Sequence, residues 1–570
     1  MTTLPLEAPP DARRHQDRVW LAGRRGAWAP LLAVLAVLLP LGVAAAIAIA
    51  RHPTLVLGGD TAFVEQAVVD AEHLRQLLGS VDRFGVAHLG PAHYYLLAPV
   101  YWLLGNQAYA LAVGSLVLVG AAAAAVVAVA ARRGGPGFAL GAALVVILYL
   151  HSIGAERLRD PWGPWAILLP IVLFMVLAAA WAAGSRAALP GALVTGSFIA
   201  QTHISTPPTL AAVLLVAWLV RRLGGARGPA WPAPRHHRRE LLLLGGLWAL
   251  VALCWLPPLI EQVTGDPGNL TLLYRFLRQP HGGFDGQGFP PTDQTSQTLS
   301  HAASGLGLEF SVFPAGRAGA LINEVTSPLV FPNKGRLALV VLYAALAAAL
   351  VVAARLRGDR FALTLGVASL VSMATAVVSF LHIVGPFLDY LIAWTTALPV
   401  TIWLGWAALA SGWLRTREEG RWRRAGPALA AALACLVVAA GAAQTVAMAR
   451  LPSLAAIATP QGANPTLAPA AALVRADLAR APGRVLLRIA DPDTWPVVAA
   501  VGNQLLRHDQ PVAVAGAWIH MFGDAYRPTG GERIEYTFAD AAREAVWAAP
   551  SGRRLGRVGD VVVFRRDLPG

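Results

Sequence analysis

Charged residues and cysteines are both scarce in this sequence. Of its 570 residues, 14% are charged and two are cysteines, whereas soluble domains carry about 25% charged residues. So little charge excludes an ordinary soluble globular protein. The cysteines, Cys254 and Cys435, both lie in apolar segments, so no disulfide framework is expected. The sequence also lacks a Walker loop, a glycine-rich dinucleotide fingerprint and clustered metal ligands, which argues against a nucleotide-driven pump.

Apolar residues make up 56% of the chain and gather in long runs. Eleven runs reach or approach the length that crosses a bilayer, about 17 to 25 residues. They lie near 28–50, 108–131, 137–153, 165–183, 187–204, 207–220, 241–259, 337–354, 361–381, 388–410 and 427–446. The sequence therefore predicts an α-helical polytopic membrane domain over 28–446, with about eleven transmembrane helices.

Arginine-rich segments alternate with these runs. They precede the first run and follow the second, sixth, eighth and tenth, and cytoplasmic loops carry such an excess of positive charge. The alternation predicts a cytoplasmic N-terminal tail (1–27) and a C-terminus outside. The net charge of +14 is then a sign of membrane topology and not of nucleic-acid binding.

The first predicted outer loop, 51–107, contains the stretch RFGVAHLGPAHYYLLAPVYWLLG. Pro91 can begin a helix, because proline is tolerated in the first helical turn. A helix over 91–104 would be only about 21 Å long, short of a hydrocarbon core of roughly 30 Å. We therefore expect a juxtamembrane helix in this loop, with Tyr94, Tyr95, Tyr101 and Trp102 at headgroup level.

Two further segments are predicted to lie outside. A large outer loop covers 260–336 and is rich in glycine, proline and threonine. Residues 447–570 form the second segment, in which 484–490, 511–515 and 560–566 read as strands and 466–481 and 495–507 as amphipathic helices. This pattern predicts a small soluble C-terminal α/β domain.

Polar side chains from separate segments converge on the outer ends of the predicted helices. Ionisable groups near lipid are costly and usually mark a functional site. The converging residues are Asp60, Glu65, Arg83, His88, Arg157, Arg159, Asp160, Gln201, His203 and Asn269.

The acidic residues among them also have purely structural interpretations. Asp60 could cap the helix that follows it, since aspartate is a favoured N-cap. Asp160 precedes Pro161 and could be an N-cap with proline at the first helical position. Glu65 could lie on a solvated helix face.

The other candidates have structural alternatives of the same kind. Arg157 and Arg159 could bind lipid headgroups. Gln201 and His203 could make hydrogen bonds between helices, as polar residues in membrane helices often do. Asn269 could serve the turn that Pro267 and Gly268 begin.

The arrangement resembles a known superfamily. An aspartate shortly after the first helix, a juxtamembrane helix begun at a His…Gly-Pro turn, and an Arg/Asp pair in the second loop are similar to the GT-C superfamily. These are multi-span glycosyltransferases that take sugars from polyprenyl-phosphate carriers. The likeness covers roughly 28–280 and is carried by GGDTAFVEQ, the 83–105 stretch, LRDPWGPW with SFIAQTH, and WLPPLIEQVTGDPGNL.

The resemblance implies a role for each candidate residue. A sugar would pass, with inversion, from a polyprenyl-phosphate donor to a hydroxyl of a cell-envelope glycan or glycolipid. Asp60 would be the general base, kept ionised by neighbouring arginines. The donor phosphate would be bound by Arg83, His88, Arg157 and Arg159, and the substrates by Glu65, Asp160, Gln201, His203 and Asn269. No cofactor is certain, although a divalent cation is compatible with the carboxylates.

Two other functions remain open at this point: a flippase or transporter of a polyprenyl-linked glycan, and a non-catalytic relative that binds a glycolipid. The expected location in each case is the bacterial cytoplasmic membrane, in contact with membrane lipids. A transporter fits less well, because the charged residues gather at one face rather than along a path through the membrane.

Overall fold

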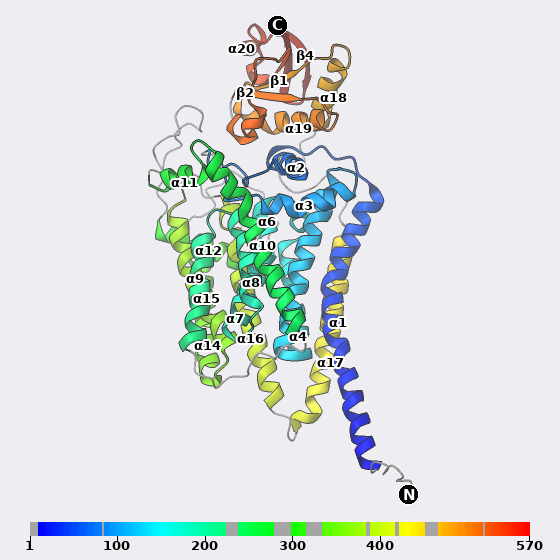
Figure 1. Cartoon of the computed structure of the whole chain (residues 1–570), viewed down its shortest axis with the longest axis vertical. Helices are drawn as coiled ribbons and strands as arrows, with labels where there is room; N and C mark the ends of the chain where they lie inside the picture. Colours follow the sequence, from blue (N-terminus) through cyan, green and yellow to red (C-terminus); the bar gives the residue numbers. More distant parts are fainter. Residues whose placement is uncertain are drawn as a thin grey trace.

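The chain forms a helical bundle with a small sheet domain at one end (Figure 1). The computed structural model describes all residues except 1–9, 83–84, 224–236, 279–297, 315–332, 384–387, 417–420, 451–465, 517–518 and 570. The N-terminal end of α1 and the C-terminal domain lie at opposite ends of the bundle (Figure 1). Arg83, one of the predicted phosphate ligands, lies outside the described residues.

Every predicted apolar run is helical in the structure. The bundle helices are α1 (Pro10–Arg51), α4 (Tyr109–Ile153), α6 (Gly163–Ala166), α7 (Leu168–Ala182), α8 (Ala188–Thr202), α9 (Pro207–Leu223), α10 (His237–Thr264), α14 (Lys334–Arg357), α15 (Arg360–Leu381), α16 (Ala397–Thr416) and α17 (Arg421–Ala449). Within the described residues, eight helices are long and apolar enough to cross a membrane. The chain is thus a multi-pass membrane protein, whereas the count of eleven spans stays a prediction.

The difference between these two counts has a simple origin. Helix α4 contains two predicted runs, which meet at Gly135 with φ of 68° and ψ of −159°. This backbone conformation strongly favours glycine, and Pro136 follows it at the start of the second half. Helices α8 and α9, with 15 and 17 residues, are too short to be counted by themselves, whereas α6 and α7 together form one candidate span of 20 residues, Gly163–Ala182.

Small residues allow the bundle helices to approach closely. A Cβ atom on Gly441 of α17 would lie 3.0 Å from the carbonyl oxygen of Ala36 in α1. One on Gly405 of α16 would lie 2.4 Å from the Leu350 side chain of α14. Since lipid offers no hydrophobic force that drives helices together, such close contact is what stabilises a membrane bundle.

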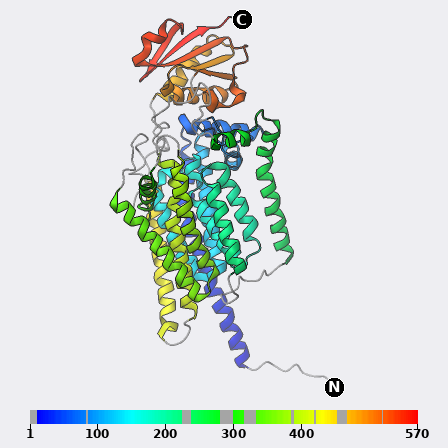
Figure 2. The same ribbon diagram turned by 90° about the vertical axis from the view of Figure 1, so that its left-hand side faces the viewer.

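Two short helices lie across the end of the bundle nearest the C-terminal domain: α2 (Gly59–Glu72) and α3 (Ala92–Leu103) (Figures 1 and 2). The predicted juxtamembrane helix is confirmed as α3, with Pro91 as its N-cap. Trp102 is exposed, as expected at headgroup level, but Tyr94 and Tyr101 are buried in the protein, so their predicted headgroup position is wrong. The same end of the bundle carries α5 (Ala155–Leu158), α11 (Asn269–Arg278), α12 (Leu299–Phe310), η1 (Asp389–Leu391) and η2 (Ala393–Thr396).

The C-terminal domain is a five-stranded mixed sheet of order β2-β1-β3-β5-β4. Strand β1 pairs in parallel with β2 and β3, whereas β5 pairs antiparallel with β3 and β4. The strands are β1 (Val485–Ile489), β2 (Val512–Gly516), β3 (Ile534–Asp540), β4 (Arg553–Val558) and β5 (Val561–Asp567). The helices are α18 (Leu467–Leu478), α19 (Trp495–Leu506) and α20 (Glu544–Ala548), with η4 (Pro492–Thr494), η5 (Ile519–Phe522), η6 (Asp524–Tyr526) and η7 (Ala541–Arg543).

One face of this sheet and helices α18 and α19 enclose the core of the domain. Leu487 and Tyr536 on the sheet and Val474 and Val501 on the helices belong to one buried cluster. The three predicted strands correspond to β1, β2 and β5, and the two predicted helices to α18 and α19, so these predictions are confirmed. Strands β3 and β4 were not predicted.

We expect the C-terminal domain to lie outside the cell, opposite the N-terminal tail. A reporter enzyme that is active only outside the cytoplasm, fused after Leu568, should therefore be active. The same reporter inserted after Gly358, in the turn between α14 and α15, provides the internal control and should be inactive. Activity of a cytoplasm-only reporter at Leu568 would contradict the topology.

Candidate active site at the end of the bundle

Two carboxyl groups lie near each other where α2, α3 and the loop between α5 and α6 meet. Asp60 belongs to the first turn of α2, and Asp160 belongs to the loop. The two are close enough that the charge of Asp60 raises the pKa of Asp160. They come from positions 100 residues apart, as the sequence predicted for a site built from separate outer segments.

Asp60 does not cap α2. The N-cap is Gly58, and it has no capping hydrogen bond from a side chain, so the cap interpretation of Asp60 is wrong. Burial raises the pKa of Asp60 from 3.8 to about 6. Burial is the only cause of this shift found among the described residues, so the expectation that neighbouring arginines keep Asp60 ionised stays a prediction.

Asp160 is 1% exposed, and one of its two carboxylate oxygens is hydrogen-bonded within the local turn. Its Oδ1 accepts a hydrogen bond of 2.9 Å from the Trp162 amide, whereas Oδ2 is buried and has no hydrogen-bond partner among the described residues. The N-cap of α6 is Trp162, so the predicted cap at Asp160 is wrong. Burial raises the pKa of Asp160 to about 7, although the Trp162 amide and the Arg157 charge oppose this.

The two arginines beside this pair lie inside the protein. Arg157 is 6% exposed, and its guanidinium lies 4.7 Å from the centre of the Trp165 ring. Arg159 is 5% exposed. Burial of this extent does not fit contact with lipid headgroups as their only role, whereas it suits cations that meet an anionic ligand in a site of low dielectric.

The two histidines are held by backbone carbonyls. His88 donates from Nδ1 to the Thr202 carbonyl at 2.6 Å, and its ring centre lies 6.1 Å from that of His203. Because burial lowers the pKa of His88, its other ring nitrogen, Nε2, is an acceptor near neutral pH and would donate to a phosphate only when protonated. His203 donates to the Tyr390 carbonyl at 3.3 Å and accepts from Ser205 at 3.0 Å, so both of its nitrogens are bonded.

Gln201 and Asn269 hold backbone segments together. Gln201 accepts from the Ala92 amide at 3.2 Å and donates to the Cys254 carbonyl at 2.8 Å, which joins α8 to α3 and α10. Asn269 accepts from the Ala87 amide at 3.1 Å and donates to the Ala87 carbonyl at 2.9 Å. The contacts of Gln201 match its structural interpretation, whereas the Asn269 side chain bonds a distant segment and not the turn at Pro267 and Gly268. Together the two residues fix the chain on either side of His88.

Glu65 is 2% exposed, so its expected place on a solvated helix face is wrong. Its carboxylate accepts a hydrogen bond of 2.9 Å from the Tyr101 hydroxyl and forms an ion pair with Arg507 of the C-terminal domain. The ion pair satisfies the carboxylate inside the protein, which leaves little of it for a substrate.

Sequence reasoning missed two residues on α3 that border the carboxyl pair. The Tyr94 hydroxyl is 2.7 Å from Ser80 Oγ and lies within the field of Asp60, while burial raises its pKa to about 12. His93 donates from Nε2 to the Pro161 carbonyl at 2.7 Å, and its Nδ1 is buried with no partner among the described residues. Burial lowers the pKa of His93 to about 4, so Nδ1 is an acceptor. The sequence signal that could have identified His93 and Tyr94 is their position just after Pro91, at the start of the predicted juxtamembrane helix.

The site has few groups for a metal ion. The described part of the chain contains no group of three or more His, Cys, Asp or Glu side chains that could hold one. Asp60 and Asp160 therefore form a pair of carboxyl groups without a third ligand of these types. A divalent cation stays a prediction, which would need further ligands from substrate, water or undescribed residues.

Comparison with known proteins identifies the fold. No family model and no curated protein matches the chain. It is similar to the crystal structure of ArnT from Cupriavidus metallidurans bound to undecaprenyl phosphate, with 14% identity, a TM-score of 0.53, and coverage of 95% of this chain and 98% of that chain. The same protein in the apo state gives 14% identity and a TM-score of 0.47, over 95% of this chain and 98% of that chain. An oligosaccharyltransferase from Archaeoglobus fulgidus gives 13% identity and a TM-score of 0.38, over 91% of this chain and 71% of that chain.

ArnT is a GT-C glycosyltransferase, so the chain has the GT-C fold that the sequence predicted. The likeness extends over nearly the full length of both chains, including the C-terminal domain.

We expect Gln201→Ala to destabilise the protein, because it leaves the buried Ala92 amide and Cys254 carbonyl without their partners. The loss should be about 1–3 kcal/mol for each buried group left unsatisfied. Thermal unfolding of the purified protein in nanodiscs would measure it. The matched control is Gln107→Ala, at an exposed position, which should change stability by less than about 0.5 kcal/mol. Equal unfolding temperatures for the two variants would contradict the structural role of Gln201.

Proposed function

We propose that the protein is a glycosyltransferase that moves a sugar, with inversion, from a polyprenyl phosphate to an acceptor hydroxyl. The observation that carries this proposal is the pair of the half-buried Asp60 and the buried Asp160, both with raised pKa values, beside the buried Arg157. Titratable groups perturbed in this way gather at catalytic sites. The fold supports it, since ArnT, which shares the fold, was crystallised with undecaprenyl phosphate.

The buried arginines explain how the phosphate of the donor would be bound and stabilised. As the bond between the anomeric carbon and the phosphate oxygen breaks, the electron pair leaves with the phosphate, and fixed positive charges stabilise it. Arg157 and Arg159 are buried at the site, and we propose that they bind the phosphate together with Arg83. His88 can join them as a donor only in its protonated form.

Asp60 is the better general base of the two carboxyl groups. It has the lower pKa, about 6 against about 7, and it is less buried than Asp160. At neutral pH, Asp60 is therefore the group that is more fully ionised, whereas Asp160 keeps its proton to a higher pH. Asp60 would take the acceptor's proton while the acceptor oxygen attacks the anomeric carbon from the side opposite the phosphate, which inverts that carbon.

The location of the site suggests where the reaction occurs. Helix α2, which carries Asp60, and helix α6, which follows Asp160 in the chain, lie at the end of the bundle that faces the C-terminal domain (Figure 1). With the predicted topology, this end is the outer face of a bacterial cytoplasmic membrane. An acceptor in the cell envelope, a glycan or a glycolipid, would reach the site there, whereas the donor's long apolar chain would remain in the bilayer.

The base assignment predicts a large effect of Asp60→Asn. Asparagine keeps the size of the side chain but cannot accept the acceptor's proton, so turnover should fall by about 10²–10⁴-fold. Release of undecaprenyl phosphate from synthetic undecaprenyl-phosphate hexose and pentose donors, with a membrane extract as the acceptor source, would measure it. Binding of undecaprenyl phosphate to the variant should be nearly unchanged.

Three outcomes would contradict this proposal. Normal turnover by Asp60→Asn would move the base to Asp160. Donor that is moved across a vesicle membrane without being cleaved would indicate a flippase. Donor that is bound but neither moved nor cleaved would indicate a non-catalytic binding protein.

The pKa of the base also predicts how the rate depends on pH. A general base works only when deprotonated, so kcat/KM should be full near neutral pH and fall as the pH drops through about 6. The fall should be about tenfold per pH unit well below that value. The residual activity of Asp60→Asn should lack this acidic fall. A parent profile that stays flat down to pH 4, near the ordinary pKa of aspartate, would show that no buried carboxylate acts as the base.

A further inference from the structure

We propose that the C-terminal domain holds α2 in one rotational setting and thereby positions Asp60, with Glu65 and Arg507 as the positioning residues. This inference rests on the proposed role of Asp60 as the base. It assigns a task to a domain that contributes no residue to the carboxyl pair itself.

Helix α2 is buried between two different partners. On one side, Val64, Ala67 and Val68 belong to the hydrophobic cluster that includes Leu97 and Tyr101 of α3. On the other side, Ala62 belongs to the core cluster of the C-terminal domain. Because the helix has only 14 residues and would be marginal in isolation, these two faces decide how it lies.

A buried polar cluster lies between the two buried faces of α2. We call it the Glu65 junction, and it consists of Glu65, Tyr101, Asn503 and Arg507. Glu65 accepts from Tyr101 of α3 at 2.9 Å and pairs with Arg507 just after α19. Asn503 of α19 donates to the Ala62 carbonyl of α2 at 2.6 Å. One carboxylate thus ties α2 to the membrane domain and to the C-terminal domain at the same time.

The C-terminal domain contacts α2 at three further places. Near the start of the helix, Phe63 stacks on Trp495 with ring centres 5.5 Å apart and meets Phe522 edge-on at 4.8 Å. One turn later, Gln66 donates to the Phe522 carbonyl at 3.0 Å. Asp70, near the end of the helix, has a hydrogen bond with Tyr526. The C-terminal domain therefore contacts α2 along its length, whereas Asp60, in the first turn of the helix, lies near Asp160.

Small rotations of α2 matter because of its geometry. A side-chain oxygen about 5 Å from the axis moves by nearly 2 Å when the helix turns by about 20°. A misplacement of about 1 Å at a reacting group can lower a rate by roughly 10²-fold. Loss of the Glu65 junction should therefore reduce turnover without removing any group that touches a substrate.

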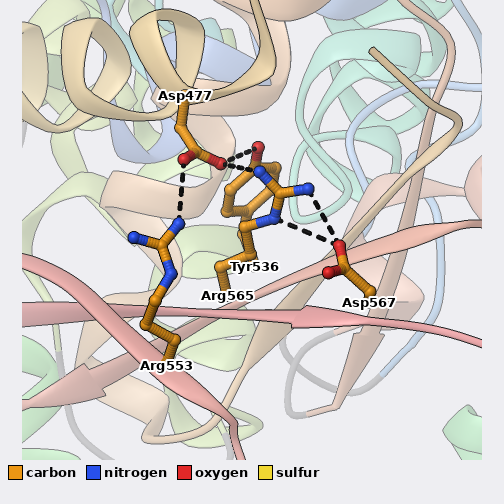
Figure 3. Close-up of polar contacts among 5 residues, drawn as sticks. All are labelled: Asp477, Tyr536, Arg553, Arg565 and Asp567. Carbon is orange, nitrogen blue, oxygen red and sulfur yellow. Dashed lines mark hydrogen bonds and ion pairs between the residues drawn. The ribbon is translucent and has the colours of Figure 1, made fainter. Parts of the chain in front are cut away.

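The domain contains a matched control for this junction. Asp477 of α18 is also a buried carboxylate that accepts from a tyrosine hydroxyl, Tyr536 at 2.9 Å, and from an arginine, Arg565 at 2.7 Å (Figure 3). Arg553 and Asp567 complete this second cluster (Figure 3). It ties α18 to the sheet and has no residue from α2. Arg565→Met therefore makes the same kind of change as Arg507→Met without acting on α2.

The test compares these two variants as full-length protein in nanodiscs, each normalised to the amount of folded enzyme. One measurement is hydrogen exchange of the α2 amides. The other is the rate of undecaprenyl phosphate release from the synthetic hexose and pentose donors, resolved into kcat and KM. Glu65→Gln combined with Arg507→Met keeps an acceptor for the Tyr101 hydroxyl without a buried unpaired charge, while Asn503 keeps its bond to the Ala62 carbonyl. This double variant serves if Arg507→Met alone does not fold.

We expect Arg507→Met, or the double variant, to speed exchange in α2 and to lower kcat by about 10-fold to 10²-fold, with KM for the donor within about twofold of the parent. Arg507→Lys should recover part of the rate. Arg565→Met should change neither α2 exchange nor kcat. A folded Arg507→Met variant with parental exchange and kcat would overturn the inference, as would equal effects of the two arginine variants.

The experiment also distinguishes a wrong glycosyltransferase assignment from a wrong role for Arg507. If the parent enzyme releases no undecaprenyl phosphate from either donor, the glycosyltransferase assignment is wrong and Asp60 has no base role to position. The exchange comparison still decides whether Arg507 holds α2.

Discussion

A bilayer leaves no backbone polar group without a partner, and most of this molecule follows from that constraint. Chain segments in lipid must be helical, so the apolar runs become the helices of the bundle. Charged side chains are costly in the same medium, and those of the candidate site lie where the helices end. Asp60, Asp160 and Arg157 are thus gathered at one end of the bundle by solvation before any chemistry is considered.

The same low dielectric that confines these groups also shifts their pKa values. Burial raises the pKa values of Asp60 and Asp160 into the range in which a carboxyl group can take up and release a proton near neutral pH. The buried Arg157 supplies positive charge beside them, and its planar group packs on Trp165. A developing phosphate charge would meet a cation that water screens little.

The membrane domain could be predicted because its signals are local. Apolar length locates the helices, and Pro91 locates the start of α3. Strand β3 was harder, because Glu535 and Thr537 alternate with Ile534, Tyr536 and Phe538 directly after a glycine-rich turn. That alternation is a strand signal, and it becomes clear once Glu535 is seen to pair with two arginines on the sheet.

The environment of Glu65 could not be predicted from its neighbours in the chain. An acidic side chain in an outer loop suggests solvent, and only Arg507 and Asn503, more than 400 residues later, reveal that it is buried. Because Glu65 depends on residues of the C-terminal domain, the order in which the site can form is also limited. Without the C-terminal domain, α2 would expose Ala62 and Phe63 to water and leave the Glu65 carboxylate paired with Tyr101 alone. The membrane domain can therefore form its bundle first. Helix α2 takes its final orientation only when the C-terminal domain has folded and packed against it.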